Sequence, residues 1–264
     1  MHFDQFERTE YKNNTLFNVV FQARFPDILK ISHEAPVQFQ DRVRRDGYPE
    51  TDSTIPALPP NAPNELKQLI TAEQVFHFYS EDRNWQLSLS KNFLAVSCNG
   101  NYENYIEFRG RLENALQTFS EIYEPSYFSR IGLRYQDIAN EVFLPNMQDS
   151  VASFVPNHVF PELKTHIASD IDNLQKVSRF ADEDVKVTVS HLYFNASGTF
   201  GLRHVPNKMS YLIDIDCYSE NKTRGISDVL ARCDTFKQHI WNIFQWSITD
   251  EFRAAMGEPR PSEN

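Results

Sequence analysis

Apolar and polar residues alternate along several short stretches of this chain, which is the pattern of strands with one buried and one exposed face. Residues 85–90, with the sequence WQLSLS, show the strictest alternation. Other stretches rich in β-branched and aromatic residues also predict strands. They are residues 15–25, 75–80, 93–98, 128–138, 185–194, 199–205 and 210–218. Together these stretches predict a large antiparallel sheet.

Two longer stretches carry apolar residues three or four positions apart, as on one face of an α-helix. The first spans about residues 102–122 and the second about residues 226–246. The expected buried stripes are Phe108, Leu112, Leu116 and Phe119 in the first, and Leu230, Cys233, Ile240 and Phe244 in the second. Both stretches predict long helices that pack on the sheet.

Shorter elements are expected between the strands and the long helices. Apolar spacing predicts helices at 34–46 and 163–174. Thr249 can cap a last short helix, because a threonine hydroxyl accepts a hydrogen bond from the first helical turn. Five prolines in residues 49–63 predict an extended or mobile loop, since proline fixes φ and lacks an N–H donor.

The two halves of the chain repeat one order of elements: a strand, a short helix, about three strands and a long helix. A local echo supports the repeat, with Arg24-Phe25-Pro26-Asp27-Ile28 resembling Arg134-Tyr135-Gln136-Asp137-Ile138. We interpret residues 1–125 and 126–257 as two α+β halves of one integrated unit. Residues 258–264 are expected to form a disordered tail.

The predicted fold class is α+β. Two β-α-β-β-β-α halves would form one curved antiparallel sheet with the two long helices on one face. This saddle-like duplication is similar to the TATA-binding-protein-like saddle, an analogy at the level of the fold that carries no function. It would leave the other face of the sheet open, with Gln86, Ser88 and Ser90 on that face.

The chain is acidic, with 36 Asp and Glu residues against 26 Lys and Arg residues and a formal net charge of −10. General nucleic-acid binding is therefore not expected, because it needs clustered positive charge. The three cysteines, Cys98, Cys217 and Cys233, form no Cys-x-x-Cys pair and predict free thiols in a reducing cytoplasm. Neither a secretory signal nor a transmembrane stretch is recognisable, so a cytoplasmic location without membrane contact is expected.

Asp214 and Asp216 form the sharpest chemical feature of the sequence. Side chains two positions apart on a strand share a face, so the two carboxylates could bind Mg²⁺ or Mn²⁺. The preceding residues are faintly similar to the nucleotidyltransferase signature, although Leu202 replaces a small residue and Pro206 disfavours the expected helix. The alternative is a solvated sheet face on which the carboxylates pair with Lys or Arg.

Arg24 and Arg134 are the candidate anion-binding residues, because each occupies the first position of the five-residue echo. The alternative is structural: each arginine would form an ion pair with the aspartate three positions later, Asp27 or Asp137. No zinc pattern occurs among the eight histidines, and no Gly-x-Ser-x-Gly or glycine-rich phosphate loop is present. The sequence thus contains no coherent catalytic set.

Several segments resemble a sporadically distributed bacterial protein family of about this length, for which no activity is established. They are NVVFQARFP, FYSEDRNWQLSLSKNFLAVSC followed by NYIEF, RIGLRY and SITDEFRAAMG. The resemblance covers nearly the whole chain, which implies a single unit rather than a fusion, and it implies no catalytic residues. Patchy distribution is common among genes linked to defence and toxin systems.

The expected function is that of a non-catalytic cytoplasmic protein that binds a protein partner in a bacterial defence or toxin system, without a cofactor. One alternative is a metal-dependent enzyme that acts on nucleotides or nucleic acid, with Mg²⁺ or Mn²⁺ on Asp214 and Asp216. The second alternative is a sensor of a nucleotide or small molecule, with Arg24 and Arg134 as the anion contacts. The sequence does not indicate the oligomeric state.

Overall fold

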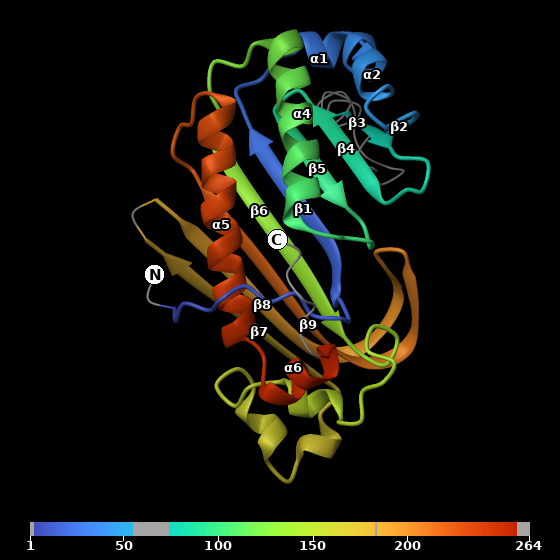
Figure 1. The fold of residues 1–264 in the computed structure, drawn as a ribbon, viewed down its shortest axis with the longest axis vertical. Coiled ribbons are helices and arrows are strands. Elements are labelled where there is room, and N and C mark those ends of the chain that lie inside the picture. Colours follow the sequence, from blue (N-terminus) through green and yellow to red (C-terminus); the bar gives the residue numbers. More distant parts are fainter. Residues whose placement is uncertain (1–2, 55–73, 183, 258–264) are drawn as a thin grey trace, which may run out of the picture. The chain divides into compact units, whose positions relative to one another are not determined.

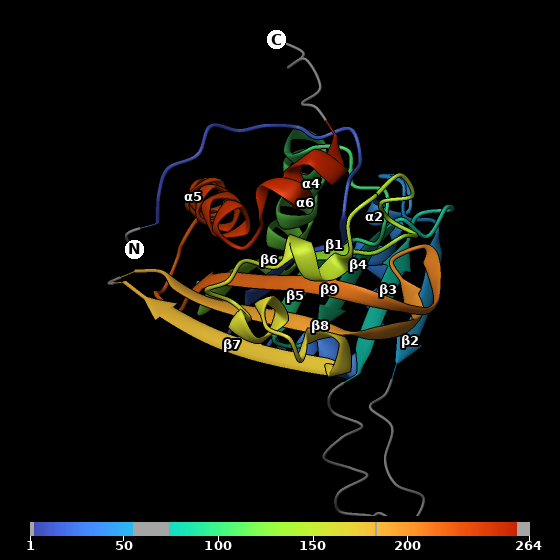
Figure 2. The same cartoon turned by 90° about the horizontal axis from the view of Figure 1, so that it is seen from below.

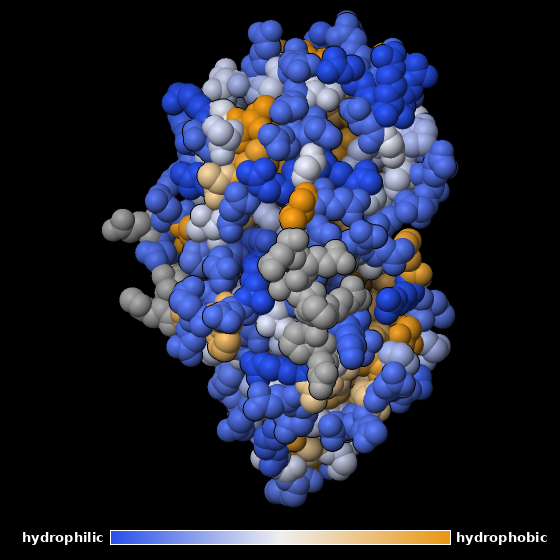
Figure 3. All heavy atoms as spheres, in the orientation of Figure 1, coloured by the Kyte–Doolittle hydropathy of each residue, from blue (hydrophilic) through white to orange (hydrophobic). Residues whose placement is uncertain are grey.

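The computed structural model describes residues 3–54, 74–182 and 184–257. This part of the chain has the expected α+β architecture, with five α-helices and one large antiparallel sheet of nine strands (Figure 1). The strand order is β2-β3-β4-β5-β1-β6-β9-β8-β7. Hydrophilic residues cover most of the face drawn in Figure 3. No helix of the described residues is long and apolar enough to cross a membrane.

The chain folds as two compact units. Unit 1 consists of Met1–Val19, Leu133–Ser219 and Asp234–Asn264, and unit 2 consists of Val20–Gly132 and Glu220–Cys233. Three elements contribute residues to both units: β1 (Leu16–Arg24), β6 (Arg130–Ala139) and α5 (Ile226–Trp246). The other elements each belong to one unit.

The strands and helices of unit 2 follow the sequence pattern closely. Its elements are α1 (Leu29–His33), α2 (Val37–Val43), β2 (Glu50–Thr54), β3 (Val75–Tyr79), β4 (Trp85–Ser90), β5 (Phe93–Cys98) and α4 (Tyr105–Tyr123). The predicted apolar stripe of α4 is buried. Asn104 caps this helix, since its side chain accepts a hydrogen bond from Glu107 N at 2.9 Å. The first long helix is thus confirmed.

Two short segments of unit 2 differ from the sequence expectation. The helix expected at 34–46 is shorter, because Pro36 lies at the N-cap of α2 and separates it from α1. Residues 50–54 of the expected proline-rich loop form strand β2, which pairs with β3. The rest of that loop, like the expected disordered tail 258–264, lies outside the described residues.

The polar positions of β4 are less open to water than expected. Leu87 and Leu89 are fully buried on one face of the strand, as predicted. On the other face, however, Ser88 and Ser90 are also buried, and Ser90 Oγ donates a hydrogen bond to Gln74 O at 3.2 Å. The expectation that both serines lie on an open, wetted face was therefore wrong.

Unit 1 contains a long β-hairpin next to an edge strand. Its strands are β7 (Asn173–Ala181), β8 (Lys186–Phe200) and β9 (Arg203–Ser219), which follow three short 3₁₀ helices, η1 (Val151–Phe154), η2 (Pro161–Lys164) and η3 (Ala168–Asp170). The last helix is α6 (Asp250–Met256). In Figure 2, α6 lies on one side of β7, β8 and β9, and the opposite side of these three strands carries no α-helix.

The β8–β9 hairpin joins stretches that the sequence analysis treated as separate strands. β9 continues through Pro206, where a break in the β8–β9 register lies between Ala196 and Gly198. Asn207 adopts a left-handed φ of 49° beside it. A β-bulge of this kind accommodates proline, because proline cannot donate a hydrogen bond to the neighbouring strand.

The helix expected at 163–174 was wrong. The structure has two single-turn 3₁₀ helices here, η2 and η3, and Leu174 already belongs to strand β7. Of the four apolar residues spaced like a helix face, Ile167 is 45% exposed, so the spacing does not mark a buried face. The last helix is confirmed: Thr249 Oγ1 accepts a hydrogen bond from Phe252 N at 3.3 Å.

Candidate functional site

A hollow lies in unit 1, where the N-terminal segment meets the end of β7 and the end of α5. Alternation along β7 places Phe180 on the half-buried face of the strand and Arg179 on the exposed face. Trp246 is the last residue of α5. The N-terminal segment runs beside this helix, because Phe6 N donates to Asn242 Oδ1 at 3.2 Å and Trp241 Nε1 donates to Glu7 O at 3.1 Å.

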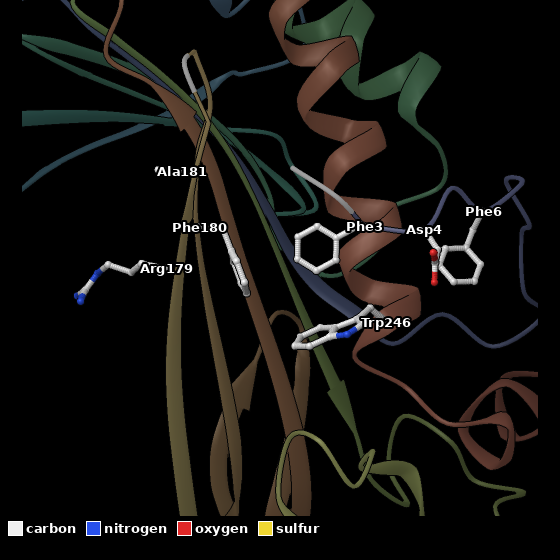
Figure 4. Close-up of a pocket in the computed structure, with 7 residues that line it drawn as sticks. All are labelled: Phe3, Asp4, Phe6, Arg179, Phe180, Ala181 and Trp246. Atoms are coloured by element: carbon white, nitrogen blue, oxygen red, sulfur yellow. The ribbon is translucent and has the colours of Figure 1, made fainter.

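Three aromatic rings form the base of this hollow (Figure 4). The ring of Phe3 lies edge-on to Phe180 at 5.1 Å and to Trp246 at 5.6 Å, and Phe180 lies edge-on to Trp246 at 6.4 Å. Edge-to-face geometry at these separations is favourable, because the positive ring edge meets the negative ring face. The three rings thus join three segments that are far apart in the sequence.

The hollow has a volume of about 600 Å³. Its lining residues are Phe3, Asp4, Phe6, Arg179, Phe180, Ala181 and Trp246. Arg179 extends away from the three rings, and Asp4 lies on the far side of Phe3, next to Phe6 (Figure 4). An aromatic base with an acidic residue at its border can accept an apolar side chain and bind a polar or cationic group beside it.

His158 also packs against Trp246. The two rings are 4.4 Å apart, and His158 Nε2 lies 3.1 Å from Trp246 O. Lys176 of β7 donates to His158 O at 2.8 Å. Burial lowers the pKa of His158, the hydrogen bond to Trp246 O opposes this effect, and the charge of Lys176 adds to it. The indole is therefore held in one orientation at the hollow.

A buried histidine lies beneath this region. His191 is fully buried, and its ring is parallel to that of Tyr211 at 6.1 Å. Ser247 Oγ donates to Ile243 O at 2.7 Å, so it can accept from His191 Nε2, 3.0 Å away. Burial lowers the pKa of His191 to about 4, with Lys176 adding to the effect. We interpret this neutral histidine as part of the core.

The predicted residues Arg134 and Asp214 lie together on the exposed side of unit 1. Arg134 Nε donates to Asp214 Oδ1 at 2.7 Å, and its Nη2 donates to Asp214 Oδ2. Gln136 Nε2 also donates to Asp214 Oδ2, at 3.1 Å. This bidentate ion pair raises the pKa of Arg134, mainly through the hydrogen bond to Asp214. The structure thus pairs an arginine proposed for anions with an aspartate proposed for a metal.

Asp216 shares a face of β9 with Asp214, as their spacing predicts. It lies opposite Thr188 of β8, while Asp214 lies opposite Ser190. Among residues 3–54, 74–182 and 184–257, no group of three or more His, Cys, Asp or Glu side chains could hold a metal ion. Asp214 and Asp216 therefore have no third carboxylate beside them in this part of the chain.

We expect Mg²⁺ and Mn²⁺ to leave the thermal unfolding midpoint of the wild-type protein unchanged, because Arg134 already neutralises Asp214. In the variant Arg134→Gln, Asp214 loses this cation, so Mn²⁺ should raise the midpoint. The double variant Arg134→Gln/Asp214→Asn serves as the control and should lose the response. A Mg²⁺ shift in the wild type that nucleotide enlarges would contradict this expectation and favour a metal-dependent enzyme.

Arg24, Asp27 and Asp137 have partners other than those expected from the sequence. Arg24 is exposed at the end of β1, where its Nε donates to Gln22 Oε1 at 3.3 Å. Asp27 forms an ion pair with Lys91 at 3.0 Å, and Asp137 accepts a hydrogen bond from Thr15 Oγ1 at 2.8 Å. The expected Arg–Asp pair at each strand end was therefore wrong, because Asp137 is inside β6 and points into the core.

A Ser–His–Asp line across three strands of unit 2 was missed by the sequence analysis. Asp52 of β2 is directly opposite His77 of β3, which is opposite Ser88 of β4. His77 Nδ1 lies 2.9 Å from Ser88 Oγ and 2.9 Å from Gln86 Nε2. Burial lowers the pKa of His77, and Asp52 opposes this effect.

We interpret this line as cross-strand hydrogen bonding rather than as a catalytic set. Ser88 is only 7% exposed, and its Oγ also lies 3.0 Å from Gln86 Nε2. A nucleophile needs room for the substrate next to its oxygen. The spacing of the three residues in the sequence carried no signal, because it depends on the strand register.

Comparison with known proteins does not assign this chain to a family. No protein-family model matches the sequence, and no curated protein matches it significantly. The resemblance to a sporadic bacterial family therefore stays a prediction from the sequence, and the function has to be inferred from the site itself.

Proposed function

We propose that this chain is a non-catalytic binding protein that engages a protein partner through the aromatic hollow of unit 1. The occupant would be an extended segment of the partner with one aromatic or large aliphatic side chain. That side chain would contact Phe3, Phe180 and Trp246. Aromatic residues in a hollow with a polar border are typical of the few positions that dominate binding energy at protein interfaces.

The single observation that carries this proposal is the partial exposure of three mutually packed rings at a 600 Å³ hollow. The partner is expected to be basic, because the chain has a net charge of −10 and complementary charge accelerates association. The location in the cytoplasm and the link to bacterial defence or toxin systems stay predictions from the sequence.

Synthetic peptides with a central Trp test the proposal directly. Lysine-flanked nonapeptides should bind the full chain, whereas the same peptides with a central Ala or with Asp flanks should bind weakly. The variant Phe180→Ala should weaken binding by about tenfold or more, the effect of losing about 1.4 kcal/mol. Leu202→Ala removes an apolar side chain that is 45% exposed at the β8–β9 turn, and should leave binding unchanged.

Fluorescence anisotropy of labelled peptides provides the measurement, with a thermal melt of each variant to verify folding. Equal affinity of the Trp and Ala peptides would contradict the proposal. So would unchanged binding by a folded Phe180→Ala protein. Turnover of a substrate by the purified chain would overturn the non-catalytic part of the proposal.

The two alternatives from the sequence are less favoured by the contacts of their residues. In the metal-dependent enzyme, Asp214 and Asp216 would bind Mg²⁺ or Mn²⁺, but Asp214 is occupied by Arg134 and Gln136. In the sensor, Arg24 and Arg134 would contact an anion, but Arg134 is already neutralised by Asp214. Both alternatives therefore require the Arg134–Asp214 pair to open.

We also propose that the chain arose by internal duplication, with the saddle-like sheet and the two long helices on one face expected from the sequence. The order of strands supports this, because β3-β4-β5-β1 is followed by β6-β9-β8-β7, its mirror order. Cys98 and Cys217 are both buried, near the ends of the strands that precede the long helices. Arg24 ends β1 whereas Arg134 is inside β6, so the five-residue echo does not mark matching positions.

A further inference from the structure

Strand β7 has the properties of an interface strand. It is the last strand of the sheet order, and it pairs with β8 residue by residue from Asn173 to Ala181 without a register shift (Figures 1 and 2). None of its nine residues is buried. Within the described part of the chain, its outer edge therefore presents backbone N–H and C=O groups to solvent, as a template for another strand.

Several features that block edge pairing are missing from β7. Proteins protect such edges with short strands, prolines, bulges or charged side chains, especially lysine. β7 is nine residues long, contains no proline or bulge, and has Val177 at its centre with 45% of its surface exposed. Charge is the protective feature that β7 does carry: Arg179 is on its exposed face, and Lys176 is on its half-buried face, where it donates to His158 O. The length and regularity of the strand nevertheless leave it able to pair with another strand.

We propose that β7 pairs antiparallel with β7 of a second copy of this chain, with a two-fold axis at Val177. If this axis is perpendicular to the sheet, each residue of one copy pairs with a residue of the other copy whose side chain is on the same face of the sheet. Centred on Val177, it pairs all nine residues, with Leu174 opposite Phe180, Gln175 opposite Arg179 and Lys176 opposite Ser178. Val177 then faces its own copy. This extends the proposed function, because the binding protein itself becomes a dimer.

The charges of β7 disfavour two other registers, and the pairing of all nine residues favours the one centred on Val177. In the Val177 register no two like charges are opposite each other, and an aromatic side chain meets an aliphatic one, which is a favourable cross-strand pair. Centring the axis on Lys176 would place two ammonium groups opposite each other. Centring it on Arg179 would do the same with two guanidinium groups, and both arrangements are destabilising.

A cysteine at the axis tests the register in the full chain. In the variant Val177→Cys, the two new thiols would lie across an antiparallel pair with Cα atoms about 4.5–5.5 Å apart, which a disulfide can bridge. The matched control is Ala181→Cys, exposed on the same face of β7, whose thiols would be roughly 26 Å apart in the dimer. The three natural cysteines are buried and contribute little background.

We expect mild oxidation to convert most Val177→Cys protein into a disulfide-linked dimer and to leave Ala181→Cys monomeric on non-reducing gels. Analytical ultracentrifugation of the unmodified chain should give twice the mass of 30.8 kDa. The variant Val177→Lys should sediment as a monomer, and Leu202→Lys should remain a dimer. Added salt should tighten the dimer, because each copy carries a net charge of −10.

Two results would overturn the inference. One is a wild-type chain that sediments as a monomer at every concentration. The other is equal cross-linking of Val177→Cys and Ala181→Cys, which would exclude the Val177 register. Neither readout involves the peptides used above, so failure of the dimer and failure of the partner-binding proposal are distinguishable.

Discussion

We expect the variant Asp137→Asn to be more favourable, relative to the wild type, at about pH 8 than at about pH 5. The quantity compared is the free energy of unfolding. Asp137 is buried in unit 1, with Thr15 Oγ1 as its hydrogen-bond donor. Burial raises the pKa of this carboxyl from 3.8 to about 7. Folding therefore favours the protonated acid, and ionisation above pH 7 opposes folding.

The sign of the effect follows from the raised pKa. The contribution of Asp137 to stability is complete below 3.8, its ordinary pKa, and is lost as the pH rises through about 7. Asparagine keeps an acceptor for Thr15 but cannot ionise. The difference in unfolding free energy between variant and wild type should therefore change by about 3 kcal/mol between about pH 5 and pH 8, in favour of the variant at the higher pH.

Urea denaturation at the two pH values measures this difference. Asp27→Asn is the matched control, because Asp27 is an exposed carboxylate paired with Lys91, and its difference should not favour the variant at the higher pH. A difference for Asp137→Asn that is independent of pH would show that the wild-type carboxyl does not change its protonation in this range.

Truncating Phe252 to alanine is expected to destabilise unit 1 by about 3–5 kcal/mol, the usual cost of removing a buried phenylalanine ring. Phe252 is fully buried in α6 and stacks on Phe154 of η1 at 5.1 Å. Its ring also lies edge-on to Phe244 of α5 at 6.1 Å. The cavity would open where three helices of the unit meet.

Chemical denaturation of Phe252→Ala provides the measurement. Ile106→Ala is the matched control in α4, because Ile106 is 83% exposed and its truncation should change the unfolding free energy by less than about 0.5 kcal/mol. A loss in Phe252→Ala as small as in the control would mean that α6 contributes little to the stability of the protein.

Local pattern was sufficient to predict most elements of this fold. The alternation of WQLSLS located β4, and the apolar stripes located α4 and α5, because these elements bury one face. The segment 163–174 misled the same reasoning. Its apolar spacing fits a helix, but single 3₁₀ turns and the start of β7 occupy it.

The candidate site could not be predicted from the sequence. Phe3, Phe180 and Trp246 meet only through tertiary packing, so no spacing connects them. The pairing of Arg134 with Asp214 depends on β6 and β9 being neighbours in the sheet. Pairing of the carboxylates with Lys or Arg was one alternative expected from the sequence, and Asp214 confirms it, but nothing in the sequence identifies Arg134 as the partner.

The interleaving of the two units has a consequence for synthesis of the protein on the ribosome. Unit 1 lacks its last segment until residues after Asp234 have emerged, although its first residues are made at the start. Contacts between the chain ends, such as Trp241 with Glu7, form late. Until then the strands of unit 1 expose apolar surface, and non-local pairing of this kind is slow and prone to aggregation. Fragments that end before Asp234 are therefore expected to be poorly soluble, because they lack the last segment of unit 1.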